Sequence, residues 1–216
     1  MGFGAKTASS SFRVFPNAAW KNELEGEAFR KLEQQWAHVV LLIVDEISFI
    51  GKAFFARMHF RLQQAKRRFF NEAGLDPNNH TFGGLSLILV GDFGQLEPID
   101  DWSMCDTESS QRTCHAKMRH LWKHHRQGEL LMRTFDEAVM LSSIHRSKDD
   151  LWWTESCLRL RDFTCTKEDD WDWWRLHDLD RGHLDVVQKH YFENEALWRC
   201  ARCEDVGDRN GRKLSG

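Results

Sequence analysis

VVLLIVDEIS, residues 39–48, joins an apolar run to an acidic pair, Asp45 and Glu46. A second apolar run, LSLILV at residues 85–90, is followed by the polar stretch GDFGQLEP. Near-continuous Val, Ile and Leu without polar alternation is typical of parallel strands that are covered on both faces. We therefore predict that both runs are buried parallel strands, with polar residues at their carboxyl ends.

Helical periodicity precedes each run. Before the first run, apolar residues recur every four positions at Leu24, Ala28, Leu32 and Trp36. Between the runs the same spacing recurs at Phe54, Met58 and Leu62, and we expect that helix to end near Gly74. The order helix, strand, helix, strand predicts a doubly wound α/β domain.

The pattern after the second run is less regular. A basic helix is expected over residues 115–127, and a strand with one less buried face over residues 138–143. Thr166 and Asp169 match a capping box that opens a further helix.

Composition excludes several classes of protein. The 216 residues, 41% of them apolar, suffice for one sizeable core or for one domain and part of a second. No apolar run is long enough to span a bilayer, and no secretory signal is recognisable, so we expect a nuclear or cytoplasmic protein, with the mitochondrion as an alternative. The net charge of −3 gives no general attraction to nucleic acid, so such binding must come from local patches.

Candidate metal ligands outside the strand ends are few. Cys200 and Cys203 form one C-x-x-C, but no second pair follows at zinc-ribbon spacing, so reduced thiols are expected for the six cysteines. His120 and His124 lie one helical turn apart without an apparent third ligand, which favours a solvated or DNA-facing helix.

The acidic pair has a defined chemistry in nucleoside triphosphatases. There the strand-end Asp holds Mg²⁺ through its water shell, and the following Glu orients or deprotonates the attacking water. Asp45 and Glu46 fit these roles in that order. The alternative is a helix N-cap with an acidic first turn, since the residues after Ser48 are expected to be helical.

The second strand delivers polar groups to the same edge of the predicted sheet. Open α/β sheets bind ligands at the carboxyl ends of their strands, where the amide of Gln95 can contact a terminal phosphate. The alternative for Asp92 and Gln95 is an ordinary turn, because Gly-Asp is a common turn pair.

These stretches together resemble a known family. LLIVDEIS and FGGLSLILVGDFGQLEP are similar to motifs II and III of Pif-type DNA helicases, the RecD-like branch of helicase superfamily one. TASSSF, residues 7–12, resembles motif Ia, with Ser9 in place of the family's His. Residues 139–162 resemble motif IV and the helix after it. The similarity runs along most of the chain and is strongest from Asp45 to Pro98.

The resemblance implies an α/β fold with a RecA-like, doubly wound parallel sheet of the P-loop NTPase type. Residues 1–137 would form part of the first RecA-like domain, and residues 138–216 the start of a second. The implied activity is that of an ATP-dependent DNA helicase that translocates on single-stranded DNA and unwinds duplexes. The family's roles in DNA repair, recombination and telomere maintenance are implied with it.

The resemblance also assigns roles to residues. Asp45 would bind Mg²⁺, Glu46 would activate water, Gln95 would sense the γ-phosphate of ATP, and Arg146 would reach that phosphate across the domain cleft. The motif Ia residues that would contact single-stranded DNA are Thr7, Ser9, Ser10 and Phe12, of which Phe12 is equally suited to packing in the core. The partners implied are single-stranded DNA and duplex junctions, with no membrane, and a monomer is expected.

The phosphate loop of such enzymes is not found in these residues. No G-x-x-x-x-G-K-S/T occurs in the sequence, and in GAKT, residues 4–7, Ala5 stands where the glycine must be. In register with the family, Thr7 belongs to motif Ia, downstream of the phosphate loop. We therefore expect an internal fragment of a helicase, without the phosphate loop and the C-terminal motifs, which alone hydrolyses ATP negligibly.

Two other functions stay open. The first is a degenerate, non-catalytic helicase fragment that binds DNA or a protein partner. The second is a metal-dependent nuclease using Asp45, Glu46 and Asp92, which would need several converging carboxylates. Two basic stretches, residues 57–68 and 117–126, are candidates for phosphate contact, although solvated helix faces are the favoured interpretation of both.

Overall fold

The computed structural model describes residues 5–14, 23–106, 121–145, 147–166, 185–187 and 190–191. The chain divides into two compact units, residues 1–140 and 141–216. The predicted helix after Thr166, the C-x-x-C cysteines and His120 lie outside the described residues. The assignment of residues 1–137 and 138–216 to two RecA-like domains stays a prediction.

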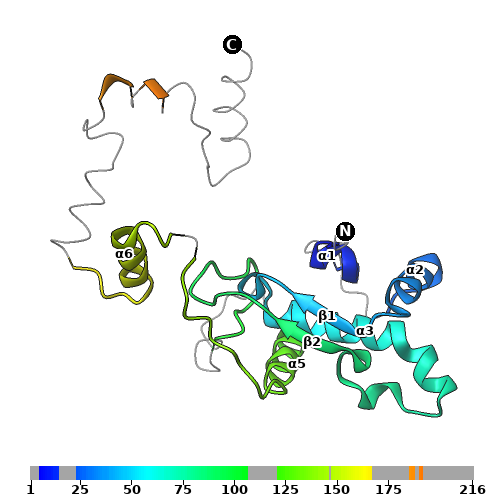
Figure 1. The fold of residues 1–216 in the computed structure, drawn as a ribbon. Helices are drawn as coiled ribbons and strands as arrows, with labels where there is room; N and C mark the ends of the chain where they lie inside the picture. Colours follow the sequence, from blue (N-terminus) through cyan, green and yellow to red (C-terminus); the bar gives the residue numbers. More distant parts are fainter. Residues whose placement is uncertain are drawn as a thin grey trace. The chain divides into compact units, whose positions relative to one another are not determined.

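The first unit holds all of the described strands and most of the described helices (Figure 1). In chain order its elements are α1 (Ala8–Phe12), α2 (Gly26–Trp36), β1 (Leu41–Val44), the 3₁₀ turn η1 (Ile47–Phe49), α3 (Lys52–Glu72), the 3₁₀ turns η2 (Pro77–Asn79) and η3 (Thr81–Gly84), β2 (Ser86–Leu89) and α5 (Trp122–Met132). The second unit contributes α6 (Leu151–Arg161), whose first turn is capped by the side chain of Asp150.

The two predicted strands pair in parallel, as the sequence indicated. Leu41 lies opposite Ser86 and Val44 lies opposite Leu89. Hydrogen bonds extend the ladder beyond both ends, from Ser86 N to Val40 O at 2.9 Å and from Val90 N to Val44 O at 2.8 Å.

The prediction that both faces of the strands are covered is wrong for the described residues. On one face Leu42, Val44, Leu87 and Leu89 pack into or against the core. On the other face Leu41, Ile43 and Ile88 are 46%, 59% and 47% exposed. Successive side chains of a strand point to opposite faces, so cover on one face leaves every second residue in solvent.

The long helix α3 supplies much of the core. Its buried residues Phe55, Met58 and Leu62 join Leu32 and Trp36 of α2 in one hydrophobic cluster. The helix also packs against α1, α5, η2 and η3. Both amphipathic helices predicted before and between the strands are confirmed, and α3 ends just before Gly74, which has a left-handed φ of +70°.

Two predictions after β2 need correction. The helix expected over residues 115–127 is α5, which continues to Met132 and buries His125, Gly128 and Leu131 against the unit, so it is not a fully solvated helix. Residues 138–143 form no strand. A strand needs a neighbour for its backbone hydrogen bonds, and no described residue pairs with this segment, whose residues 139–141 are all more than 85% exposed.

Among the helices of the described residues, none is long and apolar enough to cross a membrane.

Candidate active site at the strand ends

Asp45 and Glu46 lie directly after β1, and both are exposed. The Asp45 carboxylate accepts a hydrogen bond from the Glu46 N–H at 2.9 Å. Glu46 has the left-handed backbone conformation, with φ 56° and ψ 49°, which costs a non-glycine residue about 1–2 kcal/mol. The next N–H, of Ile47, donates to the Val90 carbonyl at 3.0 Å, so the acidic pair is held beside the end of β2.

The helix-cap alternative for the acidic pair is not borne out. Glu46 precedes the short turn η1, but its side chain makes no capping hydrogen bond. The helix α3 starts six residues later, after Gly51. Neither Asp45 nor Glu46 therefore stabilises a helix N-terminus, and the strained backbone of Glu46 calls for another explanation.

Gly91 allows the two strand ends to meet. Its φ of +151° is a conformation that side-chain-bearing residues rarely adopt, and a Cβ atom there would lie 2.8 Å from the backbone nitrogen of Ile47. A larger residue would separate the loop that carries Glu46 from the loop that carries Gln95. The role of Gly91 was not predicted, although a glycine directly after an apolar run is its signal in the sequence.

The loop after Gly91 is a hydrogen-bonded turn. The Asp92 carboxylate accepts from the Gly94 N–H at 2.9 Å, and the Asp92 carbonyl accepts from the Gln95 N–H at 3.1 Å. The turn hypothesis therefore accounts for Asp92. It does not account for the side-chain amide of Gln95, which is exposed and makes no hydrogen bond within the described part of the chain.

The two acidic side chains are open to a cation. No described Lys, Arg or His pairs with Asp45 or Glu46. Mg²⁺ prefers hard oxygen ligands and keeps most of its waters, binding through one or two carboxylates together with phosphate oxygens. The exposed Asp45 carboxylate, which has no ion-pair partner among the described residues, fits that requirement.

No group of three or more His, Cys, Asp or Glu side chains that could hold a metal occurs among the described residues. The nuclease hypothesis therefore gains no support from them.

Comparison with known proteins identifies the family. The sequence model of a family described as PIF1-like helicase matches residues 3–168. The chain belongs to this family.

The PIF1-like chain has curated relatives and solved neighbours. It is 25% identical over 135 residues to the ATP-dependent DNA helicase RRM3 of Saccharomyces cerevisiae, a match that spans 60% of this chain and 15% of that protein. It is 25% identical over 132 residues to the ATP-dependent DNA helicase PIF1 of the same species, spanning 61% of this chain and 12% of that protein. The chain thus covers only a small part of these relatives.

The fold is shared with solved helicases. A crystal structure of Pif1 helicase from Bacteroides in complex with ADP-AlF3 and ssDNA matches with a TM-score of 0.57 and 20% identity, over 98% of this chain and 44% of that chain. A structure of two coordinating Pif1 helicases that unwind forked dsDNA has the same TM-score and 19% identity, over the same shares of the two chains. These neighbours confirm the predicted α/β class with a RecA-like sheet.

The segment resembling motif Ia of the PIF1-like family forms the short helix α1. Thr7 is its N-cap, and its side chain accepts from the Ser10 N–H at 3.4 Å and donates to the Ser10 hydroxyl at 3.0 Å. Thr7 and Ser10 are exposed and Ser9 is half-buried. A DNA contact of these three residues stays a prediction.

Phe12 is corrected to a core residue. It is 2% exposed and stacks on Trp36 of α2, with ring centroids 5.0 Å apart and planes inclined by 18°. A ring held in this way cannot stack on a nucleic-acid base, so the packing alternative holds. The partner of Phe12 lies 24 positions further along the chain, so the sequence around residue 12 does not reveal this contact.

Arg146 lies outside the described residues, and its role as the arginine at the γ-phosphate stays a prediction. The roles of Asp45, Glu46 and Gln95 stay predictions as well, although the structure brings the loops that carry them to neighbouring strand ends.

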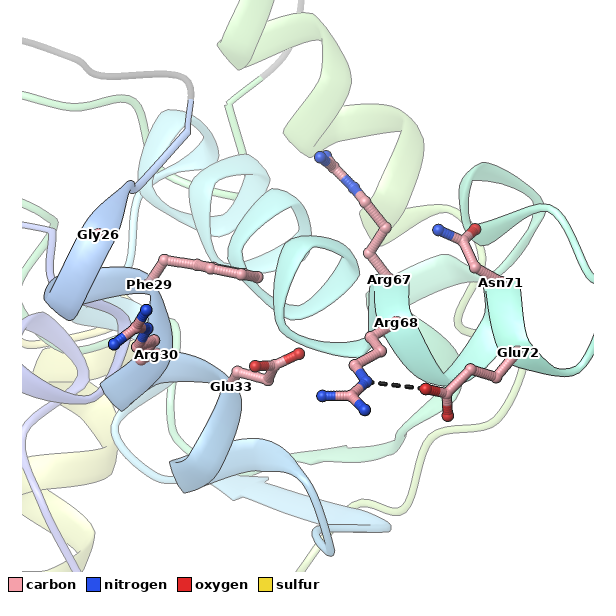
Figure 2. A pocket seen from close by; sticks show the side chains of 8 residues that line it. All are labelled: Gly26, Phe29, Arg30, Glu33, Arg67, Arg68, Asn71 and Glu72. Carbon is pink, nitrogen blue, oxygen red and sulfur yellow. Dashed lines mark hydrogen bonds and ion pairs between the residues drawn. The ribbon is translucent and has the colours of Figure 1, made fainter.

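Part of the basic stretch of residues 57–68 is paired with acidic residues. Arg67 pairs with Glu23 at 2.6 Å and Arg68 pairs with Glu72 at 2.8 Å. A groove of about 570 Å³ lies between α2 and α3. Figure 2 shows the side chains that line it, among them Arg68 with its dashed contact to Glu72. The residues that line it are Gly26, Phe29, Arg30, Glu33, Arg67, Arg68, Asn71 and Glu72. Two of its three arginines already have carboxylate partners, so an ion-paired helix face describes this surface better than a phosphate site.

Proposed function

We propose that the chain is part of an ATP-dependent DNA helicase of the RecD-like branch, which couples ATP hydrolysis to movement on single-stranded DNA and to duplex unwinding. Family membership supports this proposal. The observation that carries it is the pairing of the β1 and β2 ends, beyond which the Glu46 loop lies beside the Gln95 loop. No cationic side chain among the described residues pairs with Asp45 or Glu46 there.

Each residue has a defined part in the proposed reaction. Asp45 would hold Mg²⁺ through its waters, and the ion when bound neutralises phosphate charge. Glu46 would orient the attacking water and accept its proton, and Gln95 would contact the γ-phosphate. Arg146 would stabilise the charge of the transition state, a role that typically contributes about 10³–10⁵ in rate.

The 216 residues contain no phosphate loop, which in such enzymes supplies backbone N–H groups, a Lys and a hydroxyl ligand to Mg²⁺. We therefore expect that this polypeptide alone hydrolyses ATP far more slowly than about 1 per second, with or without single-stranded DNA. A steady-state ATPase assay checks this. Turnover of several per second that disappears in Glu46→Gln would show that the chain is a complete catalyst.

The metal role of Asp45 has a test that needs no hydrolysis. Mn²⁺ added to ¹⁵N-labelled chain should broaden the resonances of residues near Asp45, and Asp45→Asn should remove that broadening. Asp92→Asn is the matched control, because Asp92 likewise accepts one backbone N–H at 2.9 Å but has no metal role in the proposed helicase reaction. Loss of broadening in both variants would instead support a site shared by Asp45 and Asp92, as the nuclease hypothesis requires.

The degenerate-fragment alternative differs in its expected behaviour. A fragment retained only to bind DNA or a protein does not use its acidic pair, so Asp45→Asn would leave its binding of DNA or of the protein partner unchanged. The family's roles in repair, recombination and telomere maintenance, the monomeric state and the nuclear, cytoplasmic or mitochondrial location remain part of the proposal.

A further inference from the structure

The carboxylate of Asp101 lies at the junction of three segments. It follows the Gln95 loop in the chain, and its side chain is 12% exposed. One oxygen accepts from the Ala53 N–H at 3.1 Å and the other from the Phe54 N–H at 2.9 Å. The first oxygen also accepts from the Trp102 N–H at 2.8 Å and lies 2.9 Å from Nε2 of His125 in α5.

These contacts complete the N-terminus of α3. A helix leaves its first N–H groups without intrahelical partners, and a side chain at the N-cap usually accepts from them. The N-cap of α3 is Gly51, which has no side chain. Here the Lys52 N–H donates to the Trp102 carbonyl at 2.8 Å, and the next two N–H groups donate to Asp101. The cap therefore comes from a residue 48 positions away from Ala53.

Two glycines make room for this arrangement. A Cβ atom at Gly51 would lie 2.2 Å from Cγ of Asp101, and one at Gly128 would lie 2.0 Å from the Lys52 carbonyl oxygen. Any larger residue would push the Asp101 segment or α5 away from the start of α3.

His125 holds the carboxylate from the other side. Its ring is fully buried and lies on Trp102, with centroids 4.0 Å apart. Its Nδ1 atom is buried and has no hydrogen-bond partner among the described residues, which is unfavourable for stability. A phenylalanine would fill the same space without an unsatisfied atom. The histidine is thus explained by its Nε2–H donor to Asp101 rather than by packing.

The hydrogen bonds of Asp101 link the two loops of the candidate site. One loop runs from the end of β1 to the start of α3 and carries Glu46, and the other runs from the end of β2 to Asp101 and carries Gln95. At the sheet they are joined by the Ile47–Val90 hydrogen bond. At their far ends Asp101 joins them again, so both loops are fixed at both ends relative to each other.

We propose that Asp101, held by His125, is a positioning residue that sets the separation of Glu46 and Gln95. The importance of that separation for catalysis rests on the proposed function. Small displacements of catalytic groups cost large factors in rate, since a misplacement of about 1 Å can cost about 10²-fold.

Hydrogen exchange of single backbone amides in the full 216-residue chain tests the proposal. Asp101→Ala should accelerate exchange of Ala53 and Phe54, which lose their acceptor, and also of Ile47 and Gln95, whose own hydrogen bonds remain. We expect at least a tenfold acceleration at Ile47 and Gln95. The matched control is Asp76→Ala, which removes a similar cap from Asn78 in the same unit without touching either loop. It should leave Ile47 and Gln95 unchanged.

Unchanged exchange at Ile47 and Gln95, with faster exchange only at Ala53 and Phe54, would overturn the proposal and leave Asp101 as a helix cap. If Asp101→Ala does not fold, His125→Phe and His125→Gln decide. His125→Phe keeps a ring on Trp102 but loses the hydrogen-bond donor, and it should accelerate hydrogen exchange of the Ile47 and Gln95 amides. His125→Gln has a side-chain N–H donor, and exchange of these amides should be slower than in His125→Phe. Equal exchange rates in the two variants would contradict the role of the Nε2–H donor.

A second measurement separates this proposal from the proposed function. If Asp45 binds the metal, added Mn²⁺ broadens the Gln95 side-chain amide in the unaltered chain, and in Asp101→Ala this selective broadening should fall severalfold. No broadening in the unaltered chain would count against the metal role of Asp45 alone, because hydrogen exchange involves neither metal nor nucleotide.

Discussion

At the scale of single residues, Glu46 combines a functional side chain with an unfavourable backbone conformation. Its left-handed φ of 56° is retained although glycine would adopt it without strain. We expect Glu46→Gly to raise the free energy of unfolding by about 1 kcal/mol relative to Glu46→Ala, which keeps the strain. Urea denaturation of the two variants measures this difference. Equal stability would mean that the left-handed conformation carries no cost here.

His59 gives the protein a predictable sensitivity to acid. The ring is 6% exposed, its Nδ1 accepts from the Phe82 N–H at 3.0 Å, and burial lowers the pKa of His59 from 6.5 to about 4. Between these values the unfolded chain binds the extra proton, so the stabilisation is complete above pH 6.5 and is lost as the pH falls toward 4. At pH 5 the free energy of unfolding should be about 2 kcal/mol lower than at pH 8 from this group alone.

The control for that prediction is His59→Asn, whose side-chain oxygen can still accept from the Phe82 N–H but does not titrate. Its unfolding free energy, measured by urea denaturation at several pH values, should fall less between pH 8 and pH 5 than that of the unaltered chain. Parallel pH profiles would contradict the assignment.

Residue-level predictions succeeded where the signal was local. Asp45 and Glu46 follow an apolar run directly and Gln95 lies five positions after another, so the sequence alone places them after strand ends. The burial of Phe12 depends on Trp36, and the role of Asp101 depends on α3 and α5, segments far away in the chain. The spacing of residues within one short stretch of sequence does not predict contacts of this kind.

At the scale of secondary structure, continuous apolar runs predicted the two parallel strands, and helical periodicity predicted α2 and α3, each of which buries a stripe of apolar residues. Periodicity failed for residues 138–143, since apolar alternation does not supply the neighbouring strand that a strand requires. The predicted end of α5 at residue 127 is also too early, since the helix continues to Met132 and Gly128 makes its close approach to Lys52 of α3.

The FGG segment before β2 shows how glycine allows elements to pack. Gly83 has φ +62°, and a Cβ atom there would lie 2.5 Å from the Leu62 carbonyl oxygen of α3. Gly74 has a similar φ of +70° but nothing within 4 Å. We expect Gly74→Ala to cost about 1 kcal/mol for strain alone, and Gly83→Ala about 3 kcal/mol, because overpacking adds to the strain. Thermal or urea unfolding of both variants measures the two losses of unfolding free energy. Equal losses would show that α3 can move away from residue 83 at no cost in stability.

At the scale of the whole molecule, the uncovered face of the sheet is the main departure from what the sequence predicts. Runs such as VVLLIV are typical of strands covered on both sides, yet in the described residues the core lies on one side only. The chain spans 44% of the solved helicase chains that share its fold. The apolar side chains on the open face are therefore of the kind found in covered strands, but the described residues do not cover them.

Matched threonine substitutions test whether that face is open in solution. Val44 is 6% exposed and Ile43 is 59% exposed, although they are neighbours in β1. Val44→Thr buries a hydroxyl and should lower the unfolding free energy by about 2 kcal/mol, whereas Ile43→Thr should change it by less than about 0.5 kcal/mol. Urea denaturation of the 216-residue chain gives both values. If Ile43→Thr costs as much as Val44→Thr, the second face is covered by a further copy or another part of the chain. If Ile43→Thr instead costs little in the 216-residue chain and more in a longer polypeptide, the added residues cover this face, because the cost rises only where Ile43 becomes buried.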